Sequence, residues 1–280
     1  MSDVPEIILN NDVRVPQLGF GVWQIPNEDV RVVVSTALEA GYRSIDTADG
    51  YGNEEGVGAA IAASGIARDE IFVTTKLWNR AHGHDPALRA FDASLERLGL
   101  DYVDLYLIHW PVPRADKYVE TWRALEKLYA DGRVRAIGVS NFQPAHLTRL
   151  FEETGVVPAV NQIELHPHLP QLAMRNFHAE HGIATEAWSP LAQGGELLRD
   201  AAVVSIADRY VRTPAQVLLR WHIQLGNIVI PKSVTPARIA QNLAVFDFTL
   251  DDEDLTTLAT LETGERTGPD PDTFNLGHDS

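Results

Sequence analysis

Short apolar runs alternate with segments of helical periodicity along most of this chain. The apolar runs predict eight strands over residues 18–22, 44–46, 71–77, 103–109, 134–140, 159–164, 183–189 and 227–232. Amphipathic stretches between them predict helices, among them residues 29–40, 86–98, 119–130 and 214–225. About eight strand–helix units in this order are typical of an α/β fold with a closed parallel sheet, the (β/α)8 or TIM barrel.

The remaining patterns fit a single domain over residues 1–280. A barrel kept as one unit commonly has this length, and 45% of the residues are hydrophobic. The run at 103–108 is almost continuously apolar, which suits a sheet covered on both faces. Residues 7–9 and 13–15 flank a turn-forming Asn-Asn-Asp and predict an N-terminal β-hairpin. Residues 251–261 predict an extra C-terminal helix, and residues 263–280 a flexible tail.

An open doubly wound sheet is the competing architecture. That fold normally needs a glycine-rich turn directly after a strand. The nearest candidate, Gly56-Val57-Gly58, lies inside a helix-like segment at 54–63 and lacks a third glycine. The barrel is therefore preferred.

Charge and cysteine content narrow the class of protein further. The chain carries 39 Asp and Glu against 23 Lys and Arg, a formal charge of −16, which disfavours nucleic-acid and anionic-membrane partners. It has no cysteine, so disulfides, thiolate metal sites and cysteine nucleophiles are excluded. The N-terminus does not resemble a signal peptide, and no apolar run approaches the length of a bilayer span. We expect a cytoplasmic protein.

Polar side chains stand where most of the predicted strands end. The βα loops of a barrel surround one mouth at these carboxyl ends, so we expect these side chains to lie near one another. In strand order they are Asp46, Lys76, His109, Ser140 with Asn141, Gln162, Trp188 with Ser189, and Lys232 with Ser233.

Asp46, Lys76 and His109 gain a chemical meaning beside Tyr51, which lies five residues after Asp46. A phenol with a pKa near 10 is a poor proton donor at neutral pH, and a nearby ammonium lowers that pKa. We expect Lys76 to act in this way on Tyr51, and Asp46 to keep the lysine charged and fixed. His109 can orient and polarise a carbonyl by hydrogen bonding. This set suits proton delivery to an oxygen that is gaining negative charge.

The motifs around these residues resemble those of the aldo-keto reductases. They are DTA at 46–48 with YGNE at 51–54, TKLW at 75–78, DLYLIHWP at 104–111, IGVSNF at 137–142, NQIE at 161–164 and IPKS at 230–233. All occur in order, and the resemblance extends from about residue 16 to 247. Within the family, YGNEEGVGAAIAASGIAR at 51–68 and GVVPAVNQIELHP at 155–167 are most similar to the prokaryotic 2,5-diketo-D-gluconate reductase branch.

The resemblance implies an NADPH-dependent (β/α)8 enzyme that reduces carbonyls, among which keto-sugars, diketones and α-keto esters are candidates, and a monomer. Matched residue by residue, it implies a catalytic tetrad of Asp46, Tyr51, Lys76 and His109. It also implies cofactor contacts from Ser140, Asn141, Gln162, Trp188, Ser189, Leu191, Gln193, Lys232, Ser233, Arg238 and Asn242. Trp23, Trp78 and Trp110 correspond to the aromatic walls of the substrate pocket.

The position of two cations supports NADPH without the resemblance. Lys232 follows the last predicted strand, and Arg238 lies six residues further on. Barrels often bind phosphate near their last two strands, and two cations there could neutralise a 2′-phosphate within an acidic protein.

Three segments differ from the 2,5-diketo-D-gluconate reductase branch, and because they border the substrate pocket in the family, the resemblance does not fix the identity of the substrate. The predicted pyrophosphate loop at 189–195 has Ala192 where glycine is common, the loop at 79–86 carries His82 and His84, and the tail at 263–280 borders the pocket in the family.

Two other functions are weighed against reduction. A module that binds NADPH without useful turnover is disfavoured by the complete tetrad. A metal-dependent hydrolase would need clustered His and Asp ligands, but Asp46 and His109 share the mouth with a lysine and a phenol. The pairs His82/His84, His166/His168 and His178/His181 lack a suitably placed carboxylate, so we predict no metal site.

Overall fold

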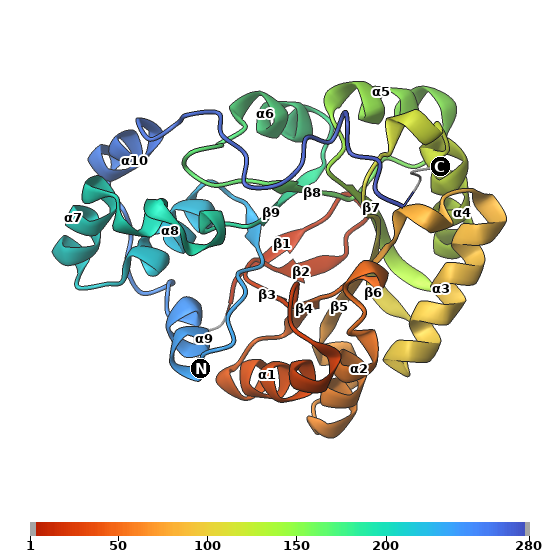
Figure 1. The fold of residues 1–280 in the computed structure, drawn as a ribbon, viewed down its shortest axis with the longest axis horizontal. Helices are drawn as coiled ribbons and strands as arrows, with labels where there is room; N and C mark the ends of the chain where they lie inside the picture. The colour runs from red at the N-terminus through yellow and green to blue at the C-terminus, as the bar shows by residue number, and fades with distance from the viewer. Residues whose placement is uncertain (1–3, 278–280) are drawn as a thin grey trace.

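Eight parallel strands follow one another in chain order around a barrel in the computed structural model, which describes residues 4–277 (Figure 1). They are β3 (Phe20–Gly21), β4 (Ser44–Asp46), β5 (Phe72–Leu77), β6 (Val103–Ile108), β7 (Val134–Ser140), β8 (Val160–Glu164), β9 (Ala184–Trp188) and β10 (Ile228–Val229). A parallel bridge between Leu18 and Val229 joins the first strand region to the last. The predicted barrel is confirmed, and each predicted strand overlaps an observed one.

Helices surround this wall on its outside (Figure 1). They are α1 (Asn27–Ala40), α2 (Glu54–Ala63), α3 (His84–Leu98), α4 (Tyr118–Ala130), α5 (Pro144–Glu153), α6 (Leu172–Glu180), α7 (Ala201–Tyr210), α8 (Pro214–Gln224), α9 (Pro236–Leu243) and α10 (Asp252–Ala259). The third helix begins at His84, two residues before the predicted start, so part of the expected 79–86 loop is helical. The extra C-terminal helix is α10, and Asp251 caps it by accepting from the Asp254 backbone N–H at 2.8 Å.

The segment between β9 and β10 holds two helices, α7 and α8, where the periodicity predicted only the second. Asp200 caps α7 by accepting from the Ala202 backbone N–H at 2.8 Å. Thr213 and Gln216 form a reciprocal capping box on α8, with Pro214 at its first position. The cap at Asp200 was a sequence signal for the additional helix.

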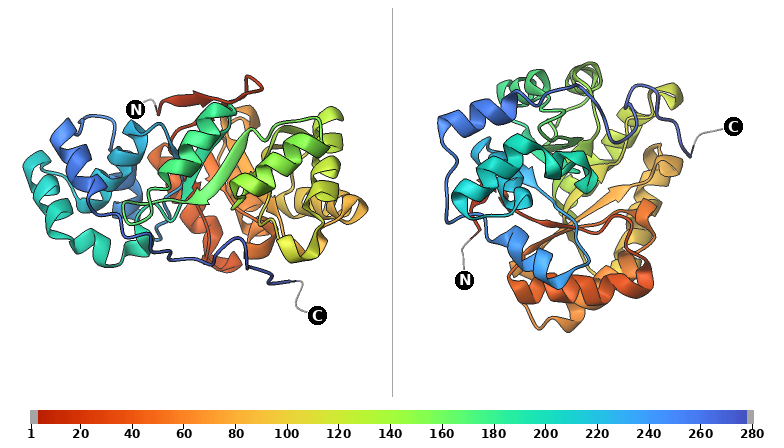
Figure 2. Two further views of the ribbon diagram at one scale, coloured as in Figure 1. Left: turned by 90° about the horizontal axis from the view of Figure 1, so that it is seen from above. Right: turned by 60° about the vertical axis from the view of Figure 1, so that its left-hand side comes forward.

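The predicted N-terminal hairpin covers the end of the barrel opposite to the polar strand ends. Its strands β1 (Glu6–Ile8) and β2 (Arg14–Pro16) pair antiparallel. Leu9 and Val15 are buried in one apolar cluster with barrel residues such as Phe72. Figure 2 shows the hairpin and the C-terminal segment at opposite ends of the molecule. The amino-terminal end is thus closed, which leaves the carboxyl ends of the strands as the mouth.

The glycine pair at 56 and 58 belongs to helix packing. A Cβ atom on Gly58 would lie 2.0 Å from the Leu98 carbonyl oxygen at the end of α3, so α2 approaches α3 closely only because this residue has no side chain. The glycines are inside α2, as the sequence indicated, and the doubly wound alternative is wrong.

Candidate active site

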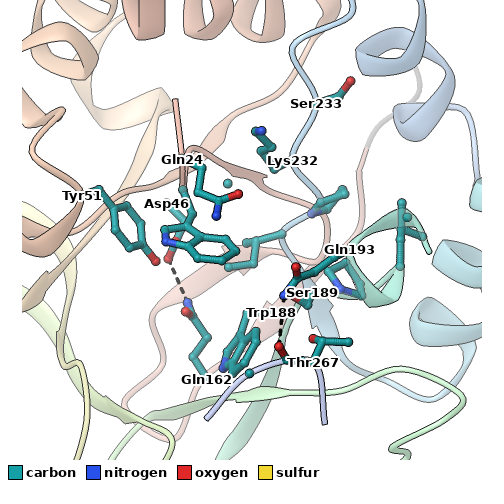
Figure 3. A pocket seen from close by; sticks show the side chains of 18 of the residues that line it. Gln24, Asp46, Tyr51, Gln162, Trp188, Ser189, Gln193, Lys232, Ser233 and Thr267 are labelled. Carbon is teal, nitrogen blue, oxygen red and sulfur yellow. Dashed lines mark hydrogen bonds between the residues drawn. The ribbon is translucent and has the colours of Figure 1, made fainter. Parts of the chain in front are cut away.

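The polar strand ends surround one cavity of about 970 Å³ at the carboxyl end of the barrel. Every site residue predicted from the sequence lines this cavity except Lys76, which lies behind the wall with no exposed surface. In Figure 3, Asp46, Tyr51 and Gln162 lie together, while Lys232 and Ser233 lie on a separate segment of the same pocket. The structure therefore brings the predicted residues together in one place.

A short turn after β4 carries Tyr51 over the mouth. This turn, η1 (Asp49–Tyr51), is held at both sides by Arg97 of α3. The Arg97 Nη2 donates to Asp49 Oδ1 at 2.8 Å, and its Nε donates to Glu54 Oε2 at 2.6 Å. One guanidinium on a neighbouring helix thus fixes the residues on either side of Tyr51 and limits the positions that its ring can take.

Three of the four tetrad residues form one hydrogen-bonded group. The Lys76 Nζ donates to Asp46 Oδ1 at 2.5 Å, to the Thr47 carbonyl oxygen at 3.0 Å and to the Tyr51 hydroxyl oxygen at 3.3 Å. The side chains of Lys76 and Asp46 are 0% and 3% exposed, so this is a buried ion pair. The His109 ring meets the Tyr51 ring edge to face, with centroids 5.5 Å apart.

The protonation balance at Tyr51 differs from the expectation. Burial raises the pKa of Tyr51 above the ordinary phenol value, and the Lys76 ammonium offsets only part of this rise. Burial also acts to lower the pKa of Lys76, but Asp46 and Tyr51 outweigh it and raise that pKa. The expectation of a net lowered phenol pKa is therefore wrong, because the sequence could not show how strongly the surroundings of Tyr51 desolvate its hydroxyl group.

His109 is a neutral imidazole in this environment. Burial, and then the charge of Lys76, hold the pKa of His109 well below its usual value. Its Nδ1 atom has no hydrogen-bond partner among residues 4–277. A neutral imidazole can donate a hydrogen bond through one nitrogen without adding positive charge to the site.

A chain of side-chain hydrogen bonds forms the floor of the cavity between β7 and β9. The Trp188 Nε1 donates to Asn141 Oδ1 at 2.8 Å, and the Asn141 Nδ2 donates to Ser140 Oγ at 3.1 Å. The Ser140 Oγ in turn donates to the Gln162 carbonyl oxygen at 2.9 Å. Consecutive strands thus present amide, hydroxyl and indole groups in one connected network.

The opposite end of the cavity carries positive charge. Lys232 and Ser233 follow β10, and Arg238 and Asn242 lie on α9, as the sequence predicted. Lys232 and Arg238 are exposed, and neither forms an ion pair within the described chain. Two unpaired cations at one end of a cavity in an acidic protein favour an anionic ligand there.

The loop after β9 connects the two ends through a left-handed backbone. Ser189, Ala192 and Gln193 have φ values of 47°, 47° and 57°. Glycine adopts this region without strain, whereas Ala192 adopts it here despite its Cβ atom. Leu191 and Gln193 both line the cavity, so the loop contributes to the site with alanine at position 192.

The C-terminal segment crosses the mouth and supplies residues that the sequence analysis did not name. Phe274 packs on Trp110 with ring centroids 4.3 Å apart, and the Asn79 Nδ2 donates to the Leu276 carbonyl oxygen at 2.8 Å. A Cβ atom on Gly268 would lie 2.4 Å from the Trp188 ring. An aromatic residue within a polar tail was the available signal. The flexibility of residues 263–280 stays a prediction, and residues 278–280 lie outside the described part.

Glu164 at the end of β8 holds this segment in place. Its side chain is fully buried and accepts from the Thr267 Oγ1 at 2.6 Å, from the Gly268 backbone N–H at 3.2 Å and from the His166 Nε2 at 3.1 Å. Burial acts to raise the pKa of Glu164, but these hydrogen bonds outweigh it and lower that pKa. His166 thus has a structural partner, as its place after the strand suggested.

Replacing Glu164 by Gln is expected to loosen the C-terminal segment. The glutamine loses the charge-assisted hydrogen bonds, each of which contributes about 1.5–3 kcal/mol. Its amide N–H groups would also face the N–H and O–H donors of the segment, with which they cannot form hydrogen bonds. Hydrogen–deuterium exchange of residues 264–276 should become roughly tenfold faster at least. The exposed Glu265 of the same segment, as Glu265→Gln, is the matched control. Equal exchange in both variants would show that Glu164 does not anchor the segment.

Within residues 4–277, no helix is long and apolar enough to cross a bilayer. In the same range, no group of three or more His, Asp or Glu side chains is placed to hold a metal ion. The histidine pairs of the sequence have other partners where the structure shows them. For example, His178 Nδ1 lies 2.8 Å from Thr185 Oγ1.

Known proteins resemble this chain over nearly its full length. A protein of Mycolicibacterium smegmatis named aldo-keto reductase is 62% identical over 272 residues, which cover 97% of this chain and 98% of that protein. The methylglyoxal reductase DkgA of Escherichia coli is 53% identical over 272 residues, covering 96% and 98%.

Solved structures agree with the sequence comparison. An aldo/keto reductase from Brucella melitensis has a TM-score of 0.90 and 58% identity, and the match covers 92% of this chain and 100% of that one. A mutant of Gox0644 in complex with NADPH has a TM-score of 0.94 and 48% identity, covering 98% and 99%. A model of the aldo/keto reductase family matches residues 17–263. With its barrel, its tetrad and these matches, the chain belongs to the aldo/keto reductase family.

Proposed function

We propose that this protein reduces aldehydes and ketones to alcohols with NADPH, with Tyr51 as the proton donor. The observation that carries the proposal is that one cavity holds a phenol bonded to a buried ammonium at one end and, at the other, two cations that form no ion pair within residues 4–277. The first end suits proton transfer to a carbonyl oxygen, and the second suits the phosphate of a nucleotide.

Tyr51 and Lys76 account for the proton. As a carbonyl oxygen gains negative charge, the Tyr51 hydroxyl transfers its proton to that oxygen and becomes a phenolate. The Lys76 ammonium, 3.3 Å from the phenol oxygen, stabilises this phenolate because the lysine is buried away from water. Asp46 keeps the ammonium in place with its 2.5 Å contact. The buried Lys76 thereby favours the charge that appears during reaction, while burial keeps Tyr51 protonated beforehand.

His109 orients the substrate. Because it is neutral, it can donate one hydrogen bond to the substrate oxygen without taking over proton delivery from Tyr51. When bound, the reduced nicotinamide supplies the hydride that the carbonyl carbon accepts. Ser140, Asn141 and Gln162 would hold its carboxamide, and Trp188 would lie against its ring.

The shape and polarity of the cavity fit this cofactor. Amide and hydroxyl groups line the floor next to the tetrad, and Ser189, Leu191 and Gln193 of the loop after β9 line the same cavity. Lys232, Ser233 and Arg238 would hold the 2′-phosphate, with Asn242 near the adenine. The NADPH complex of Gox0644 is a precedent for this cofactor in a similar structure.

Replacing Lys232 by Ala is expected to weaken NADPH binding selectively. A charge-assisted contact to phosphate contributes about 1.5–3 kcal/mol, so the Kd for NADPH should rise roughly tenfold to a hundredfold. The Kd for NADH, which lacks the 2′-phosphate, should stay unchanged. Fluorescence titration measures both values, and Lys127→Ala, on an exposed lysine paired with Asp131, is the control. An equal loss for both nucleotides would argue against a 2′-phosphate contact.

The substrate class that we propose is a small dicarbonyl such as methylglyoxal. The similar Escherichia coli protein is named a methylglyoxal reductase. Trp23, Trp78 and Trp110 line the cavity, and Phe274 packs against Trp110, so the substrate end is enclosed by aromatic rings. Such walls favour compact substrates of low charge.

Loss of absorbance at the reduced nicotinamide band tests the proposal. Methylglyoxal, a simple aldehyde, an α-keto ester and a diketo-sugar acid should be compared, and we expect methylglyoxal to give the highest kcat/KM. Tight NADPH binding without oxidation by any of them would instead indicate a binding module. Hydrolysis that depends on a metal ion and not on NADPH would overturn the proposal that this protein is a reductase.

A further inference from the structure

Besides Asp46, the buried carboxyl group of Glu186 lies beneath the tetrad, and it takes no part in the proposed proton transfer. Glu186 stands in the middle of β9, where it pairs with Gln162 of β8 on one side and Ile228 of β10 on the other. It is 2% exposed. Burying a carboxyl group costs free energy unless hydrogen bonds compensate for it. The hydrogen-bond partners of Glu186 therefore indicate what it does.

The Gln162 amide joins this group to the tetrad. Its Nε2 donates to Asp46 Oδ2 at 2.8 Å and to Glu186 Oε2 at 3.0 Å. The first of these bonds is the dashed line beside Tyr51 in Figure 3. An amide nitrogen has two hydrogens, and both are used on carboxyl oxygens. The amide oxygen is therefore turned away from them and left to accept a hydrogen bond from the cavity side.

The titratable groups around Glu186 come from strands β4 and β5 and from the turn η1. Asp46 on β4 and Lys76 on β5 face it across the barrel interior, and Tyr51 lies above them, whereas β8 and β10 present the neutral Gln162 and the apolar Ile228. Burial, and next the charge of Asp46, raise the pKa of Glu186 to about 8. With a pKa near 8, Glu186 is mostly protonated at neutral pH, and in that form the single ammonium of Lys76 balances Asp46 alone.

Ionisation of Glu186 changes the environment of the proton donor. A second negative charge would then face one ammonium, and it acts to raise the pKa of both Tyr51 and Lys76. The charge of Glu186 is therefore coupled to the phenol through space, while its oxygen is coupled to the cavity floor through Gln162.

We propose that Glu186 is a positioning residue that fixes the Gln162 amide with its oxygen toward the nicotinamide carboxamide and sets the net charge beneath Tyr51. This inference rests on the proposed function for its effect on turnover, but the hydrogen bonds that carry it belong to the protein without ligands. The orientation of the Gln162 amide and the charge near Tyr51 both depend on the position of Glu186 on β9, between β8 and β10.

Two substitutions separate the two effects. Glu186→Gln keeps an oxygen for the Gln162 amide and cannot ionise, so it imitates the protonated acid. Glu186→Ala removes the oxygen. Asp104→Asn is the control for losing a buried carboxylate, because Asp104 lies near the opposite end of β6 and pairs with Arg68 and Arg135. It is expected to lower the melting temperature and leave the pH profile unchanged.

The expected pattern differs between the variants. Glu186→Gln should match the wild-type kcat/KM near neutral pH, and the alkaline fall of reduction should move to lower pH by roughly half a unit to one unit, since removing an anion lowers the pKa of Tyr51. Glu186→Ala should raise the Kd for NADPH about tenfold across the pH range, since Gln162 loses one partner. A superimposable pH profile for Glu186→Gln together with wild-type NADPH affinity for Glu186→Ala would overturn the proposal.

Infrared spectroscopy of the protein without cofactor gives a readout that does not depend on turnover. The carbonyl band of a protonated carboxyl group should disappear as the pH rises through about 8 and should be missing from Glu186→Gln. If none of the carbonyl substrates causes the wild-type protein to oxidise NADPH, the proposed function fails. The infrared band and the NADPH titrations would still decide the role of Glu186. Absence of the band at neutral pH would overturn the protonated state that the proposal assigns.

Discussion

Replacing Tyr51 by Phe is expected to abolish most carbonyl reduction while NADPH affinity stays nearly unchanged. The substitution removes only the hydroxyl, whose oxygen lies 3.3 Å from the Lys76 Nζ. A positioned general acid commonly contributes about 10²–10⁴-fold to the rate, so kcat should fall by roughly a thousandfold. The cofactor contacts that we propose come from other strands, so the Kd for NADPH should stay within about twofold, a far smaller change than loss of one hydrogen bond would give.

A second phenol provides the control for this prediction. Tyr129 of α4 accepts a hydrogen bond from the Asn11 Nδ2 at 3.3 Å, beside the N-terminal hairpin and away from the mouth. Tyr129→Phe should therefore keep the wild-type kcat. Steady-state kinetics with methylglyoxal and fluorescence titration with NADPH measure both variants. If Tyr51→Phe retains kcat, another group delivers the proton, and the assignment of Tyr51 is wrong.

The barrel could be predicted because its evidence is local and repeated. Each strand is a short apolar run, each is followed by a helix or loop, and the polar residue at the strand end is visible in the sequence. Lys232 is predicted in this way and Arg238 from its place six residues further on, and both line the cavity. These residues can be placed together from the sequence because the parallel strands of a barrel all end at one mouth.

What the sequence did not predict depends on contacts between distant residues. Glu164 binds Thr267, about a hundred residues away, and no periodicity connects a strand end with a tail. Glu186 had a usable signal, because it stands two residues before Trp188 on the same strand and so on the same face. The raised pKa of Tyr51 follows from how the packed structure desolvates its hydroxyl group, which no sequence pattern shows.

Replacing Lys76 by Met is expected to cause the largest loss of stability among single changes in the site, as well as loss of activity. Methionine fills most of the volume but leaves the Asp46 carboxylate without its 2.5 Å partner in a site that excludes water. Removing one member of a buried ion pair commonly costs about 3–5 kcal/mol. Chemical denaturation should therefore show a free energy of unfolding lower by roughly that amount.

The double variant Asp46→Asn with Lys76→Met separates stability from chemistry. It removes both charges, and the amide oxygen introduced by Asp46→Asn can still accept from the Gln162 Nε2, which in the wild-type protein bonds Asp46 at 2.8 Å. Because exchanging a whole buried pair for neutral groups is often close to neutral, most of the lost stability should return. Activity should not return, since the phenolate of Tyr51 would still lack the ammonium that stabilises it. Recovery of kcat along with stability would mean that Lys76 contributes to folding alone, and that proton delivery by Tyr51 does not need its charge.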